Sequence, residues 1–141
     1  MKKILSVIIL IAIMALFVFQ VFVSAGFSES KNMRNNNVLS TYTRFSISSA
    51  GTSSVTVKYT GYANITTGAT IDITIKKNTF LWFTTTVVDE TYNIAAESYI
   101  NTYQYDLSSF GSGTYTCNVT YTISGSGGAD DVIPFEDTAS Y

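Results

Sequence analysis

Residues 114–123 read Thr-Tyr-Thr-Cys-Asn-Val-Thr-Tyr-Thr-Ile, with polar and apolar side chains alternating at every position. In a β-strand, alternate side chains point to opposite faces of the sheet. The stretch therefore predicts a half-buried strand, and glycines on both sides mark its ends. Its apolar face is expected to hold Tyr115, Cys117, Val119, Tyr121 and Ile123.

Six further segments carry β-forming residues between turn signals: 38–47, 54–62, 69–76, 80–89, 97–107 and 132–138. Segments 54–62 and 69–76 alternate most clearly, and Pro134 assigns the last segment to a sheet edge because proline cannot donate to a ladder. No helical stripe competes with these strands. The sequence predicts an all-β fold, a single antiparallel β-sandwich of about seven strands.

The N-terminal segment has the composition of a secretion signal. Lys2 and Lys3 precede an apolar run over residues 4–23, and Val23-Ser24-Ala25 offers a small-residue cleavage site. We expect a signal peptide over residues 1–25, cleaved before Gly26, and hence a secreted, extracellular protein. The apolar run also reaches the roughly 20 residues that span a bilayer, so a membrane anchor that is not cleaved is the alternative.

The rest of the chain predicts a short lead-in and one domain. Residues 26–37 are mostly polar, with asparagines at 35–37, and predict a flexible lead-in; residues 38–141 predict the β-sandwich. Without the leader the chain has six basic and ten acidic residues, a net charge of about −4. This balance disfavours nucleic acid and anionic lipid as partners. We expect membrane contact only if the leader is retained.

Residues 112–117, Ser-Gly-Thr-Tyr-Thr-Cys, resemble the small-Gly-x-Tyr-x-Cys segment of immunoglobulin domains. The resemblance implies an immunoglobulin-like Greek key in which the Tyr115 hydroxyl binds backbone a few residues upstream and Cys117 faces the core. The chain departs from that pattern because it has one cysteine and because Trp82 falls one strand late. As a whole the chain resembles small secreted immunoglobulin-like proteins of Gram-positive bacteria, a resemblance that implies no activity.

Catalysis is disfavoured by the absence of histidine from the sequence. Without histidine there is no Ser-His or Cys-His pair and no imidazole metal site. Acidic pairs at 89–90, 130–131 and 136–137 are expected at strand ends as solvated charge, although two carboxyl groups across a cleft can hydrolyse glycosides. We expect no enzyme, no catalytic residue and no cofactor.

Two groups have both a functional and a structural interpretation. Cys117 is either a reactive thiol or, given its place on the apolar face, a buried side chain, and we expect burial. Asp130 and Asp131 follow a glycine run and offer oxygen ligands for calcium. Because they lack the alternate spacing of a calcium loop, we predict a turn and no metal site, with calcium as the alternative.

Residues 80–83, Phe-Leu-Trp-Phe, are apolar at every position. In a strand, Phe80 and Trp82 would point to one face and Leu81 and Phe83 to the other, so the strand is either covered on both faces or exposes one set. We predict a binding site of Trp82, Leu81 and Phe83, with Trp82 as its anchor. The alternative is that Trp82 lies in the core.

The function predicted on this basis is a secreted, non-catalytic module for binding or surface interaction. Its expected partner is an extracellular glycan or protein. The alternative is a structural protein that associates with itself through its edge strands.

Overall fold

The computed structural model describes residues 26–29, 35–80 and 82–141. The predicted leader, residues 1–25, and Leu81 lie outside the described residues. Within the described part, no helix is long and apolar enough to cross a membrane. The helical structure in this part is the single 3-10 turn η1 (Ser108–Phe110).

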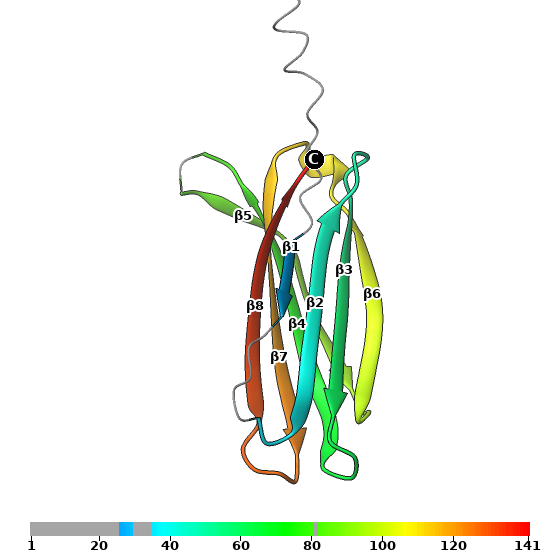
Figure 1. The fold of residues 1–141 in the computed structure, drawn as a ribbon. Helices are drawn as coiled ribbons and strands as arrows, with labels where there is room; N and C mark the ends of the chain where they lie inside the picture. Colours follow the sequence, from blue (N-terminus) through cyan, green and yellow to red (C-terminus); the bar gives the residue numbers. More distant parts are fainter. Residues whose placement is uncertain (1–25, 30–34, 81) are drawn as a thin grey trace, which may run out of the picture.

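The seven strands that follow Asn37 form a sandwich of two antiparallel sheets (Figure 1). One sheet has the order β2 (Val38–Ile47), β3 (Thr52–Gly61) and β6 (Ser98–Asp106). The other has the order β5 (Thr84–Ile94), β4 (Thr66–Asn78), β7 (Thr114–Gly125) and β8 (Asp131–Ser140). A short strand, β1 (Gly26–Glu29), pairs with β2 at the outer edge of the first sheet.

The prediction of an all-β, two-sheet antiparallel sandwich is confirmed. The strand predicted over 38–47 coincides with β2, and the strand predicted over 114–123 is β7 with two more residues. The strand predicted over 80–89 is wrong at both ends, because β5 begins at Thr84 and continues to Ile94. Within the predicted flexible lead-in, residues 26–37, the first four residues form β1 and Asn37 at its end is fully buried.

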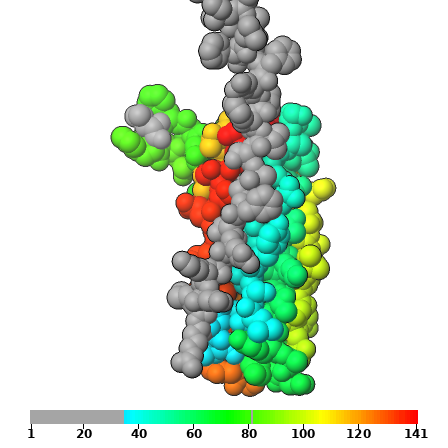
Figure 2. All heavy atoms as spheres, in the orientation of Figure 1, coloured from blue at the N-terminus to red at the C-terminus, as the bar shows by residue number. Residues whose placement is uncertain are grey.

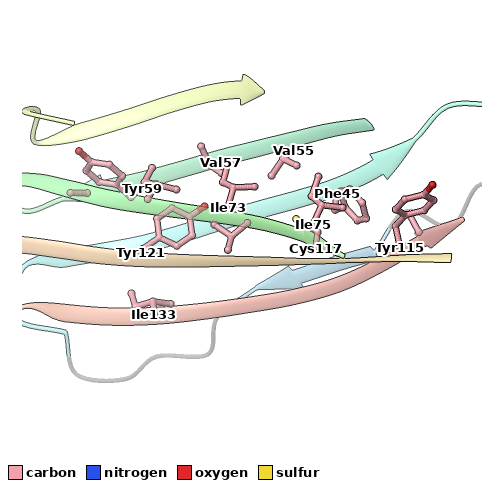
Figure 3. Packing of buried hydrophobic residues seen from close by; sticks show 14 of the residues in the cluster. Phe45, Val55, Val57, Tyr59, Ile73, Ile75, Tyr115, Cys117, Tyr121 and Ile133 are labelled. Atoms are coloured by element: carbon pink, nitrogen blue, oxygen red, sulfur yellow. The ribbon is translucent and has the colours of Figure 1, made fainter. Parts of the chain in front are cut away.

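The core lies between the two sheets and is built from the inward side chains of the alternating strands (Figure 3). On β7 the whole predicted apolar face, Tyr115, Cys117, Val119, Tyr121 and Ile123, is buried. Burial of such apolar surface is the main favourable term in folding. On β3 and β4 the predicted inward residues are buried too: Val55, Val57, Tyr59, Ala69, Ile71, Ile73 and Ile75.

Two buried tyrosines connect the layers through their hydroxyl groups. The Tyr121 hydroxyl on β7 donates to the carbonyl of Tyr42 on β2 at 2.9 Å and lies 2.6 Å from the hydroxyl of Thr43. The Tyr59 hydroxyl donates to the carbonyl of Ala96 at 2.7 Å, at the connection between β5 and β6. Buried hydroxyl groups need such partners, and burial raises the pKa of Tyr121 to about 12.

The Tyr115 hydroxyl donates to the carbonyl of Gly111 at 2.5 Å. The hydrogen bond predicted from the sequence, to backbone upstream of Tyr115, is therefore present. The thiol of Cys117, on the same face, is buried, and burial followed by the nearby charge of Asp137 raises its pKa to about 12. Because the thiolate is the reactive form, this environment makes Cys117 a small core hydrophobe.

One end of the sandwich is held by a polar network around Asn37 and Asp131. The Asp131 carboxylate accepts hydrogen bonds from the backbone N–H groups of Asn36, at 3.0 Å, and Asn37, at 2.7 Å. The Asn37 side-chain amide donates to the carbonyl of Ala129 at 2.9 Å and accepts from the N–H of Gly127 at 3.1 Å. The start of β2 is thereby fixed to the turn between β7 and β8.

The hydrogen bond of Tyr115 generates a stability prediction. We expect Tyr115→Phe to lower the free energy of unfolding by about 1 kcal/mol, because it removes the hydrogen bond from the Tyr115 hydroxyl to the Gly111 carbonyl. Tyr62→Phe is the matched control, since Tyr62 is half-buried and no described residue binds its hydroxyl. Urea denaturation of both variants measures the difference, and equal midpoints for Tyr115→Phe and the wild type would contradict a stabilising role.

Candidate functional site

The β4–β5 hairpin ends in a tight turn over residues 79–83. The N–H of Phe83 donates to the carbonyl of Phe80 at 3.0 Å, and the N–H of Thr79 donates to the carbonyl of Phe83 at 2.9 Å. The Thr79 hydroxyl donates to the same carbonyl at 2.8 Å. These local bonds end the ladder of β4 with β5 at the pair of Asn78 with Thr84, so the apolar stretch lies in a turn and not in a strand.

Three aromatic side chains of this turn are exposed to solvent, and we call them the aromatic tip: Phe80 (72%), Trp82 (85%) and Phe83 (68%). Figure 1 shows the end of the hairpin projecting away from the body of the sandwich, and Figure 2 shows the same projection as a convex protrusion. Large exposed apolar side chains that gather at one place mark interaction sites.

The exposed tip corrects two expectations. Alternation predicted that Phe80 and Trp82 would share one face and that only one set would be exposed, but Phe80, Trp82 and Phe83 are all exposed. The interpretation of Trp82 as a core residue is therefore wrong. Leu81 is part of the predicted site, and it lies outside the described residues.

The base of the hairpin is fastened to η1 by Lys77. Its ammonium group donates to the carbonyl of Phe110 and, at 3.2 Å, to that of Gly111, and it lies 5.8 Å from the centre of the Tyr115 ring. The tip is thus an exposed group on a hairpin whose base is tied to the sandwich. Because the base of the hairpin is already held in place, binding at the tip costs less conformational entropy than binding at a free loop.

The tyrosines of β5 and β6 form a second aromatic group, at the side of the sandwich where these strands lie. The rings of Tyr92 and Tyr103 stack at 3.9 Å, the hydroxyls of Tyr92 and Tyr105 lie 3.1 Å apart, and those of Tyr99 and Tyr103 lie 3.0 Å apart. Burial, followed by the hydrogen bond from Tyr99, raises the pKa of Tyr103 to about 12. These half-buried rings bind one another, whereas the rings of the aromatic tip are free to meet a partner.

The acidic pairs do not assemble into a site. The pairs at 89–90 and 136–137 lie inside β5 and β8 and not at strand ends as predicted, so the two members of each pair point to opposite faces. Asp131 is engaged by backbone N–H groups, as described above. In the described part of the chain, no three His, Cys, Asp or Glu side chains lie close enough to hold a metal ion.

Comparison with known proteins adds no family. No protein-family model matches this chain, and no curated protein matches it either.

The exposure of Trp82 predicts that it contributes little to stability. We expect Trp82→Ala to change the free energy of unfolding by less than about 0.5 kcal/mol, as for other surface substitutions. Ile73→Ala, at a fully buried position, is the matched comparison and should cost about 2–5 kcal/mol through the cavity it leaves. Urea unfolding followed by circular dichroism measures both, and a loss for Trp82→Ala as large as that for Ile73→Ala would return Trp82 to the core.

Proposed function

We propose that this protein is a secreted, non-catalytic binding module whose contact surface is the aromatic tip. The observation that carries the proposal is the exposure of Phe80, Trp82 and Phe83 together on one projecting turn. Keeping three large aromatic side chains in water gives up the favourable free energy of burying them, and a partner that covers them recovers it. Tryptophan is enriched among the residues that dominate binding energy.

The chemistry of the chain supports binding over catalysis. The sequence has no histidine, Cys117 is buried with a raised pKa, and the acidic pairs are dispersed over β5, β8 and one turn. General acid–base or nucleophilic catalysis needs such groups brought together in reach of one substrate. The partner class expected from the sequence is an extracellular glycan or protein, since aromatic faces suit both.

An immunoglobulin-like Greek key is part of the proposal. The strand order, β2-β3-β6 facing β5-β4-β7-β8, and the bond from the Tyr115 hydroxyl to the Gly111 carbonyl support it. The chain departs from constant-type domains at β5, which pairs with β4 and not with β6. Secretion with cleavage before Gly26 rests on the sequence of the leader.

The proposed function predicts that binding depends on the tip and on no other exposed apolar residue. We expect Trp82→Ala to abolish binding to the glycans or proteins that the wild type binds on a printed glycan array and an array of extracellular domains. Val132→Ala is the matched control, because Val132 is also exposed but lies beside the turn between β7 and β8. Binding that survives Trp82→Ala, or that Val132→Ala removes equally, would contradict the proposal.

Self-association is the second candidate, and the edges of the sheets favour it. Within the described part, β5 and β6 each pair with one neighbour, and Ile100 on β6 is 66% exposed. An edge strand with an exposed apolar residue is a template for a second copy. This candidate predicts oligomers in sedimentation velocity that Ile100→Lys disperses and Trp82→Ala does not. A chain that stays monomeric at all concentrations would exclude it.

A further inference from the structure

The chain enters the sandwich next to the turn between β2 and β3. Gly26, the first residue of β1, pairs with Phe45, two residues before β2 ends at Ile47. The turn that follows contains Gly51, whose carbonyl accepts a hydrogen bond from the N–H of Leu107 at 2.9 Å. Whatever precedes Gly26 in the chain is therefore joined to the sandwich at this end.

The aromatic tip belongs to the same end. The Tyr141 hydroxyl donates to the carbonyl of Leu107 at 2.9 Å, and the Tyr141 ring lies 5.8 Å from that of Tyr115. Tyr115 in turn pairs with Lys77 of β4, two residues before the turn of the hairpin begins at Thr79. Figure 1 shows the start of β1 and the end of the hairpin at one end of the sandwich. We call it the tip end.

Exposed apolar residues differ between the two ends. At the tip end, the large apolar side chains that are exposed in the described chain are all aromatic. They are the three residues of the aromatic tip and Phe110 in η1, which is 43% exposed. At the opposite end, where the turn between β7 and β8 lies, the exposed large apolar residues of the described chain are aliphatic, Leu39 and Val132. Aromatic side chains, tryptophan above all, are the residues that favour the interface between a membrane and water.

Charged residues lie at both ends of the sandwich. Lys76 and Lys77 lie at the tip end of β4, and the acidic residues Asp106 at the end of β6 and Asp137 near the end of β8 lie at the same end. Glu97 and Asp130 lie at the opposite end, beside the network of Asp131. Charge therefore does not distinguish the tip end, and the difference between the two ends lies in their exposed aromatic side chains.

We propose that the aromatic tip inserts into the headgroup region of a phospholipid bilayer and docks the tip end of the sandwich on the membrane. This inference rests on the proposed binding role of the aromatic tip, and it takes a membrane surface as the partner in place of a glycan or protein. A convex turn can enter a soft surface, where Phe80, Trp82 and Phe83 leave water without needing a matching pocket on a partner.

The sequence before β1 supports the same orientation. Residues 4–23 are free of charge and are long enough to span a bilayer, and Ser24 and Ala25 alone separate them from Gly26. In the alternative in which the leader is not cleaved, this run holds the tip end toward the bilayer surface, because the chain enters the sandwich there. Insertion of the tip is then an intramolecular event with a high effective concentration.

The single tryptophan of the chain makes the proposal directly measurable. The full chain is synthesised in a cell-free system into phosphatidylcholine nanodiscs, with and without brominated acyl chains, which quench tryptophan only at close approach. We expect the brominated lipid to quench the fluorescence of Trp82. We also expect acrylamide in the water to quench Trp82 far less than it quenches a water-exposed tryptophan. Phe80→Ser with Phe83→Ser should return both signals to those of a water-exposed tryptophan.

A chain carrying Trp82→Phe with Val132→Trp is the matched control, because it moves the tryptophan to the opposite end, and it should show no bromolipid quenching. If Trp82 is not quenched in a chain that co-elutes with the nanodisc, the membrane proposal is overturned. If Trp82→Ala nevertheless abolishes binding on the glycan or extracellular-domain array, the proposed function stands with that partner. If neither lipid nor array responds to Trp82, both proposals fail.

Discussion

The ladder between β4 and β7 is the interaction on which the other parts of this structure depend. It stands at the centre of the four-stranded sheet, with β5 and β8 attached on either side. Its inward side chains, among them Ile71, Ile73 and Val119, are fully buried against the three-stranded sheet, so the ladder carries the middle of the core. β4 continues past the residues that pack in this core as far as Asn78, and only because its inner part is fixed can its outer part hold a projecting hairpin.

The two ends of the sandwich are built on different physical principles. At one end the Asp131 carboxylate and the Asn37 amide bind backbone groups of the opposite turn, and each buried polar atom named there has its partner. A closed polar network of this kind resists opening, because breaking it leaves buried polar groups without hydrogen bonds. At the tip end the hairpin base is held through Lys77, while most of the surface of the aromatic side chains beyond it is exposed to solvent. The polar network that stabilises the sandwich and the aromatic residues proposed to contact a partner therefore lie at opposite ends.

The same asymmetry connects the proposed binding function with the membrane. The aromatic residues, the lysines of β4 and the entry of the chain coincide at one end of the sandwich, although Lys77 and Gly26 are far apart in the sequence. A glycan or protein partner explains the exposed rings alone, whereas a bilayer surface also fits the alternative in which the apolar run before β1 is not cleaved. The half-buried tyrosines of β5 and β6 fit neither role, because they satisfy one another through stacking and paired hydroxyls.

The sequence by itself determined the strands and their inward faces wherever polar and apolar residues alternate, as on β3, β4 and β7. A period of two assigns each side chain to one face of the sheet, whatever the partner strand is. It also predicted the hydrogen bond of Tyr115 and the burial of Cys117.

The sequence could not predict the conformation of residues 80–83, because four apolar residues in a row have no period. The turn is set by hydrogen bonds that Thr79 and Phe83 make to local backbone. Nor could it reveal that Asn37, within a polar run, is buried, because its partner Asp131 lies 94 residues further along the chain. Only the tertiary structure decided which end of the sandwich holds the tip and the entry of the chain, since strand order and register, and not local composition, bring them together.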